Sequence, residues 1–284
     1  MTETRRVKAI VEPQPVVEGA GVRLRRSIGT REVNYLDPFL LLDDFGSHDR
    51  NDYEAGFPLH PHRGIETVTY ILSGAVQHKD TLGNAGSIGA GDIQWMTSGR
   101  GIMHEEMPQV RPEGIAGFQL WVNLPAKVKM TRPRYQDVRA DRIPEIESRD
   151  GSRIRVVAGT AGEIRGAVTD IAADPTYLDV LVPPRSAYRG PIPSGHTAFA
   201  YVFEGRATFP GPGREEVVVA HPRLVVLGDG DEVRVTTAQE PARFLLVSGK
   251  PLHEPIARYG PFVMNTRAEI EKTLEDLRLG TFVQ

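Results

Sequence analysis

Short apolar runs separated by glycine and proline constrain the fold of this chain more than any other feature. The 284 residues include 29 Gly and 22 Pro, which are scattered along the whole sequence. Between them lie runs rich in Val, Ile, Thr, Tyr and Phe. Short strands at near-regular spacing, with Gly, Pro and Asp in the turns, are typical of an all-β sandwich or barrel. The clearest runs are ETVTYIL (66–72), GFQLWVNL (117–124), YLDVLV (177–182), AFAYVF (198–203) and RFLLVSG (243–249).

One helix is predicted at the end of the chain. Thr266 and Glu269 have the spacing of a capping box, in which each side chain bonds the other residue's backbone N–H. Apolar residues follow at helical spacing from Ile270 to Leu277, and Gly280 suits the position just after the last turn. We therefore expect a short C-terminal helix.

A weak internal repeat indicates two copies of one β unit. YILSGAV (70–76) resembles YVFEGRA (201–207), and both predict a strand, a glycine turn and a return strand. GAGDIQWM (89–96) resembles GDGDEVRV (228–235), with an offset eight residues larger. Such a difference implies loop insertions, which β proteins tolerate.

The repeat predicts two domains that meet in the polar, proline-containing stretch 125–150. We place an N-terminal domain at residues 1–135 and a C-terminal domain at residues 136–284.

Composition excludes several classes of protein. The chain is 40% hydrophobic and 25% charged, with a net charge of −3 and no long block of like charge, so we expect neither nucleic-acid nor membrane binding. It has no cysteine, which excludes disulfides and thiolate metal sites. The first 13 residues contain no apolar stretch suited to a signal peptide, which predicts a cytoplasmic protein.

Two histidine clusters stand out among the eight histidines. Residues 60–66 read HPHRGIE, and residues 104–106 read HEE. Side chains at i and i+2 of a strand share one face, which brings His60 next to His62 and His104 next to Glu106. If the two strands face one another in a barrel, these four side chains can bind one divalent metal ion.

Strand parity separates the neighbouring carboxylates. Glu105 should point away from the site, as a solvated side chain. Glu66 shares the parity of His62 and could reach inward, but it lies two pleats away, so Glu106 is the better ligand. Pro61 removes a ladder donor and marks an irregular or edge strand.

The second copy provides an internal control for the histidines. At the two offsets of the repeat, each candidate ligand of the first copy meets a residue that is not His, Asp or Glu. His60 and His62 align with Pro191 and Pro193, Glu66 with Thr197, His104 with Arg243, and Glu106 with Leu245. The fold therefore does not require the histidines, and any chemistry belongs to the first half.

The ligand types do not fix the metal. Three neutral imidazoles and one carboxylate leave two open positions on an octahedral ion, and open positions on iron are used for dioxygen chemistry. A closed tetrahedral zinc site would instead be structural. The ligand types alone therefore do not distinguish among Fe, Mn, Ni, Co, Cu and Zn. Candidates for the surrounding pocket are Phe45, Phe57, Arg63, Glu66, Met103 and Gln119, whereas Trp95 and Trp121 are expected in the core.

Both central motifs resemble the pirin family of the cupin superfamily. HPHRGIETVTYILSG, GAGDIQWMTSGRGIMHEEMP, the upstream YLDPFLLLDDF (35–45) and GPFVMNT (260–266) carry the resemblance over nearly the whole chain. It implies a bicupin, two double-stranded β-helix (jelly-roll) barrels with a degenerate C-terminal domain. It also implies the metal ligands His60, His62, His104 and Glu106, with Glu66 in a supporting role.

The resemblance further implies an iron protein, with activity similar to quercetin 2,3-dioxygenase. That enzyme opens a flavonol with O2 and releases carbon monoxide. Glu106 would then also be a candidate general base. The expected partners are a flavonol-like substrate and O2, for a protein expected to be a monomer. The alternatives are a metal-bound redox or iron sensor that binds another protein, and a β protein with a vestigial site.

Overall fold

The computed structural model describes residues 2–283, which form two compact units. The histidine unit, named for His60, His62 and His104, combines Gln14–Ala140 with the segment that begins at Leu252. The companion unit combines the segment that ends at Pro13 with Asp141–Pro251. The chain divides near the predicted seam, but the companion unit also takes the segment that ends at Pro13, and the histidine unit also takes the segment that begins at Leu252. The predicted domains 1–135 and 136–284 do not include this exchange, and they stay a prediction.

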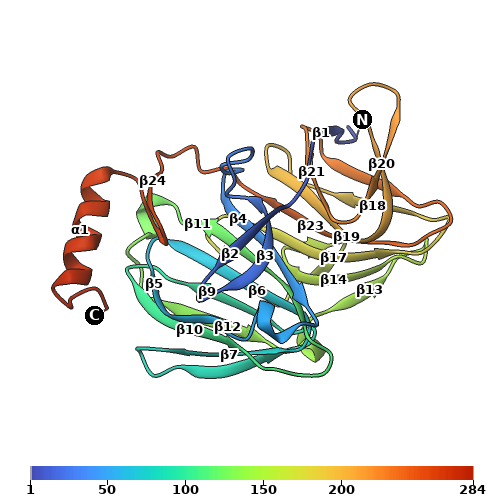
Figure 1. The fold of residues 1–284 in the computed structure, drawn as a ribbon. Coiled ribbons are helices and arrows are strands. Elements are labelled where there is room, and N and C mark those ends of the chain that lie inside the picture. Colours follow the sequence, from blue (N-terminus) through green and yellow to red (C-terminus); the bar gives the residue numbers. More distant parts are fainter. Residues whose placement is uncertain (1, 284) are drawn as a thin grey trace. The chain divides into compact units, whose positions relative to one another are not determined.

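Two antiparallel sheets form the histidine unit (Figure 1). The larger sheet has the order β12 (Arg134–Val138), β9 (Ile93–Thr97), β6 (Ile65–Ser73), β11 (Ile115–Asn123), β4 (Phe39–Ser47), β3 (Val22–Ile28) and β2 (Gln14–Glu18). The smaller sheet has the order β5 (Phe57–His62), β10 (Ile102–Pro108), β7 (Ala75–Asp80) and β8 (Ala85–Gly89). A contact of 3.0 Å between the Thr69 hydroxyl on β6 and the Glu106 carboxylate on β10 joins the inner faces of the two sheets.

A hairpin and a helix complete the histidine unit. The hairpin is β24 (Ala257–Tyr259) with β25 (Phe262–Met264), followed by α1 (Arg267–Arg278). Short 3-10 turns are η1 (Arg50–Asp52), η2 (Ala126–Val128) and η3 (Ala140–Arg142), the last at the junction with the companion unit. The predicted helix is confirmed, including both hydrogen bonds of the capping box at Thr266 and Glu269 and the positive φ of 71° at Gly280. No helix of the described residues is long and apolar enough to cross a membrane.

The companion unit has one ten-stranded sheet and one small hairpin. The path through the sheet is β1 (Val7–Val11), β21 (Arg223–Leu227), β19 (Thr197–Pro210), β23 (Ala242–Gly249), β17 (Thr176–Val182), β14 (Arg153–Ala158) and β13 (Glu145–Glu147). Off this path, β18 (Ala187–Pro191) pairs with β22 (Glu232–Thr236), and β20 (Glu216–Ala220) pairs with the far half of β19. The small hairpin is β15 (Thr160–Ala161) with β16 (Ile164–Arg165). All five predicted strand runs lie in strands, namely β6, β11, β17, β19 and β23.

The repeated glycine is a corner, not a hairpin turn. In the histidine unit, β6 pairs with β9 and β11, and after Gly74 the chain continues as β7 in the other sheet. In the companion unit, β19 pairs with β21 and β23 before Gly205 and with β20 after it. Both glycines have positive φ, 78° and 68°. The expected return strand is therefore wrong: a residue without Cβ lets the strand bend from one pairing set into the next.

Strand pairing also corrects the second half of the repeat alignment. Tyr70 pairs with Ile93, and its counterpart Tyr201 pairs with Leu224, so β9 corresponds to β21 at the same offset of 131 residues. The match of 89–96 to 228–235 is therefore wrong, because it aligned two glycine-rich turns that lie at different places in the topology. By the same logic, β5 and β10 correspond to the pair β18 and β22.

The interior of the companion unit is apolar where the histidine unit carries its histidines. β18 and β22 bury Tyr188, Gly190, Val233 and Val235. Three of these belong to one continuous core with residues such as Phe244. The same arrangement of strands therefore closes around a packed core with no imidazole at these positions.

Candidate metal centre

Strand register brings the three predicted histidines together. On the smaller sheet, His60 of β5 lies directly opposite His104 of β10, and His62 lies opposite Ile102. His60 and His62 are two residues apart, so both point to the face that His104 shares. β5 is the edge strand of this sheet, as Pro61 predicted.

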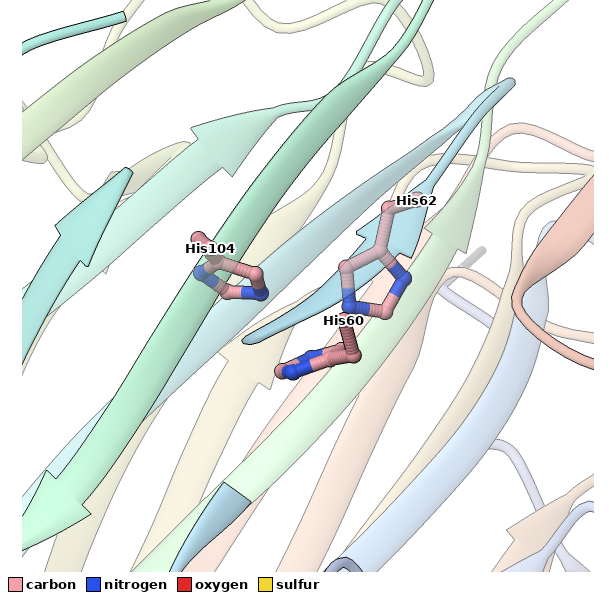
Figure 2. A group of neighbouring side chains, drawn as sticks. All are labelled: His60, His62 and His104. Carbon is pink, nitrogen blue, oxygen red and sulfur yellow. The ribbon is translucent and has the colours of Figure 1, made fainter. Parts of the chain in front are cut away.

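The three imidazole rings surround one point (Figure 2). Their ring centroids are 4.5 Å apart for His60 and His104, 4.8 Å for His60 and His62, and 5.1 Å for His62 and His104. One ring nitrogen from each lies within 4.8 Å of the others. Within residues 2–283, no other group of three or more His, Asp or Glu side chains converges in this way.

The nitrogen atoms of this group have few protein partners. Both ring nitrogens of His104 are buried and have no hydrogen-bond partner among the described residues. Those of His62 are also buried, and their one polar neighbour, the Pro261 carbonyl, lies outside hydrogen-bond geometry. His60 differs, because its Nδ1 donates to the Pro58 carbonyl at 2.9 Å. A carbonyl can only accept, so Nδ1 carries the hydrogen and Nε2 presents a lone pair.

Burial keeps two of the three imidazoles neutral. It lowers the pKa of His62 well below its ordinary value, and the nearby His104 and His60 lower it further, with only the Pro261 carbonyl acting in the opposite direction. Burial, and then the proximity of His60, lowers the pKa of His104 to about 3. Neutral imidazoles keep the lone pairs that metal ions bind.

Glu106 lies two residues beyond His104 on the same face and is buried. A bulge between these residues moves Glu106 opposite Phe57. Its carboxylate is 3.0 Å from the Thr69 hydroxyl and accepts from Gln119 Nε2 at 3.3 Å. Glu105 points to the other face and pairs with Lys79 at 3.0 Å, as its parity predicted.

These residues fit a divalent metal ion. An unpaired polar group in the protein interior costs about 1–3 kcal/mol, and the buried nitrogens of His62 and His104 have no partner in hydrogen-bond geometry. A cation bound by one nitrogen of each histidine would satisfy the nitrogens that face the common point. The group of atoms within 4.8 Å contains the three histidines and not Glu106, so its predicted role as a fourth ligand stays a prediction.

A cavity of about 480 Å³ opens beside the histidines. His60, His62 and Glu106 line it, whereas His104 is fully buried. Of the predicted pocket residues, Phe45, Phe57 and Gln119 lie on its wall. The wall is mostly apolar, which suits a planar aromatic ligand.

Arg63, Glu66 and Met103 do not line this cavity. The buried guanidinium of Arg63 bonds Asp276 of α1. Glu66 lies on the other face of β6 from Thr69 and accepts from the Thr97 hydroxyl at 2.9 Å; burial raises its pKa. Met103 alternates with His104 on β10 and packs against the apolar cluster at α1. Glu66 shares the parity of His62 along the sequence, but parity holds only within one strand. Gly64, with a φ of 81°, separates β5 from β6, and these strands belong to different sheets.

Several wall residues had not been predicted. Trp121 lines the cavity and packs edge-on against His62, with ring centroids 5.1 Å apart, so the expectation of a core residue is wrong. Trp95 is fully buried, as expected. One row of paired residues also crosses the larger sheet on its inner face; all six are polar, and only Gln119 among them had been predicted: Asp137, Gln94, Thr69, Gln119, Asp43 and Arg26. Alternation along ETVTYIL could have identified Thr69, whereas the rest depend on pairing between distant strands.

The fold and the buried histidine group define a two-unit, cupin-type β protein that can bind a metal. The Pirin family profile matches residues 21–122, and the profile of the pirin C-terminal cupin domain matches residues 177–283. The chain belongs to the pirin family.

Its relatives match over almost the whole length. A pirin-like protein of Caulobacter vibrioides is 45% identical over 98% of this chain and 99% of its own. Human pirin is 42% identical over 98% of this chain and 94% of its own. The crystal structure of quercetin 2,3-dioxygenase from Acinetobacter baumannii is 35% identical, with a TM-score of 0.87 over 99% of both chains.

Proposed function

We propose that this protein is a metal-dependent dioxygenase that opens a flavonol such as quercetin with O2 and releases one carbon as carbon monoxide. The observation that carries the proposal is the convergence of three histidines, with Glu106 beside them, at a largely apolar cavity. The likeness to the Acinetobacter baumannii quercetin 2,3-dioxygenase supports it. Relatives of this kind imply a small-molecule substrate and O2 as reactants.

His60, His62 and His104 would hold the metal, with Glu106 as the fourth ligand, and we propose Fe(II) as the ion. When bound, it supplies Lewis-acid and redox chemistry toward the flavonol hydroxyl and O2. The chain itself supplies orientation and exclusion of water. Phe45, Phe57 and Trp121 offer flat apolar surfaces on the cavity wall, on which the rings of a flavonol can stack.

Hydrogen counting supports a second role for Glu106, as general base. The single hydrogen of the Thr69 hydroxyl goes to Gln119 Oε1, which lies 2.6 Å away, and Gln119 Nε2 donates to Glu106 Oε2. Glu106 Oε1 then faces an oxygen lone pair of Thr69 at 3.0 Å. A proton taken from the substrate hydroxyl onto Oε1 would donate to Thr69 and complete this ring of hydrogen bonds.

The test is oxygen uptake with quercetin, on protein loaded anaerobically with Fe(II) and assayed for iron in the same sample. We expect uptake that depends on the metal and falls about 10²- to 10⁴-fold in Glu106→Gln, the usual contribution of a general base. Glu105→Gln is the matched control, because it makes the same change one residue away on the opposite face.

Absence of uptake from protein that contains one iron per chain would contradict the proposal. It would favour the alternative of a metal-bound regulatory protein, and the next experiment would be a search for a protein partner.

A further inference from the structure

Arg258 of β24 places a positive charge on the wall of the same cavity. Its Nε donates to the Gly260 carbonyl at 3.2 Å, and its Nη1 donates to the Leu40 carbonyl at 3.4 Å. No carboxylate of the described residues lies within ion-pair distance of it. A guanidinium has five N–H donors, so three of them have no acceptor among residues 2–283.

The nearby carboxylates do not neutralise Arg258 directly, because Arg26 binds both of them. Arg26 forms a two-pronged pair with Asp43, at 2.7 and 2.8 Å, and contacts Glu18 at 2.7 Å. Asp43 is buried and uses both oxygens on Arg26, whereas the Glu18 side chain is 42% exposed, so solvent partly screens its charge.

The Trp121 ring lies between the Arg258 charge and His62 of the metal centre. The Arg258 guanidinium lies over the Trp121 ring at 5.2 Å from its centroid, and that ring contacts His62 at 5.1 Å. The guanidinium carbon is therefore no more than about 10 Å from the centre of the His62 ring. A ligand of two or three fused or linked rings can reach both ends of this path.

We propose that the cavity selects planar enols or phenols that carry a second, anionic group, and that Arg258 binds this group while the hydroxyl end lies at the histidines. The inference rests on the proposed function for the hydroxyl end only. The guanidinium has the fork of donors that matches a carboxylate, and it lies over the Trp121 ring on the cavity wall.

The experiment compares two ligands of the same shape, 6-hydroxy-2-naphthoate and its methyl ester. Their binding to metal-loaded protein is measured under argon by titration calorimetry, so turnover plays no part. We expect the carboxylate to bind about tenfold more tightly than the ester, the effect of one partly solvated, charge-assisted contact. Arg258→Gln should abolish this preference for the carboxylate over the ester, and Arg258→Lys should retain part of it.

Arg267→Gln is the matched control, since Arg267 is an exposed arginine of the same unit, on α1. Equal binding of the two ligands by the wild type, or a preference that survives in Arg258→Gln, would overturn the inference. Because binding is measured without O2, it separates the two proposals. Quercetin oxidation without an Arg258-dependent preference refutes only this one, whereas the preference without oxidation refutes only the enzyme.

Discussion

Replacing Arg63 should destabilise the histidine unit, although Arg63 touches neither the cavity nor the metal centre. It follows His62 in the chain, and its guanidinium is almost fully buried. It donates to the Arg100 carbonyl at 2.5 Å, Thr273 at 3.1 Å and Asp276 at 2.8 Å, and it lies over the Phe282 ring. One side chain therefore ties the end of β5 to α1 and the chain beyond it.

The magnitude follows from what Arg63→Ala leaves behind. Loss of one partner of a buried ion pair costs about 3–5 kcal/mol in general. Here Asp276 keeps a second cation, Lys272 Nζ at 2.8 Å, so its carboxylate is not left uncompensated. The Arg100 carbonyl does lose its donor, and a cavity forms beneath Phe282. We therefore expect a loss of about 3 kcal/mol, toward the lower end of the range.

Urea denaturation followed by circular dichroism measures this loss, and the metal content of the same samples reports whether the ring of His62 is still held. Arg63→Lys should recover part of the stability, since an ammonium can still reach one acceptor. The exposed arginine Arg267, replaced by Ala, is the control. A change below 1 kcal/mol in Arg63→Ala would refute the reasoning and would mean that α1 contributes little to the histidine strand.

Three further outcomes are expected. His62→Ala should lose its metal, measured by elemental analysis, while its β circular dichroism stays unchanged; loss of the β signal would contradict this. Thr69→Val should lower the turnover of quercetin about tenfold at unchanged metal content, because Glu106 loses the acceptor for its proton; unchanged turnover would contradict it. Burial raises the pKa of Asp43 to about 6. The folded state then holds a proton that the unfolded state releases, so the contribution of Asp43 to stability is full below about pH 4 and is lost as pH rises through 6. Asp43→Asn should remove this dependence, measured by urea denaturation from pH 4 to 7; the same slope in both proteins would refute it.

Local patterns in the sequence were enough to predict the elements and the histidine group. The five apolar runs, the capping box at Thr266 and the i, i+2 spacing of His60 and His62 each depend on residues within a few positions of one another. The approach of His104 needed one assumption beyond this, that its strand faces β5, and the register confirms it.

Features that depend on distant pairing could not be predicted. β1 belongs to the companion unit because it pairs with β21, more than 200 residues away, and no local pattern encodes that choice. For the same reason the contribution of Arg258 to the cavity was missed, since β24 comes from the far end of the chain. The corner at Gly74 was misread because a hairpin turn and a change of sheet both require positive φ and the same residue.

The two units show how metal binding and folding are separated in this chain. Where the companion unit buries Tyr188 and Val235 in its core, the histidine unit buries imidazoles whose nitrogens have no protein partner. Without a metal those nitrogens cost stability, since burial without a partner is unfavourable for any polar group. Removing one of them should therefore cost the apo protein little. The residues that hold the site in shape lie elsewhere, in buried ion pairs such as Arg63 with Asp276, which joins the end of β5 to α1. Metal binding and stability thus depend on different side chains. A variant of a metal-binding histidine should therefore lose the metal and keep the fold.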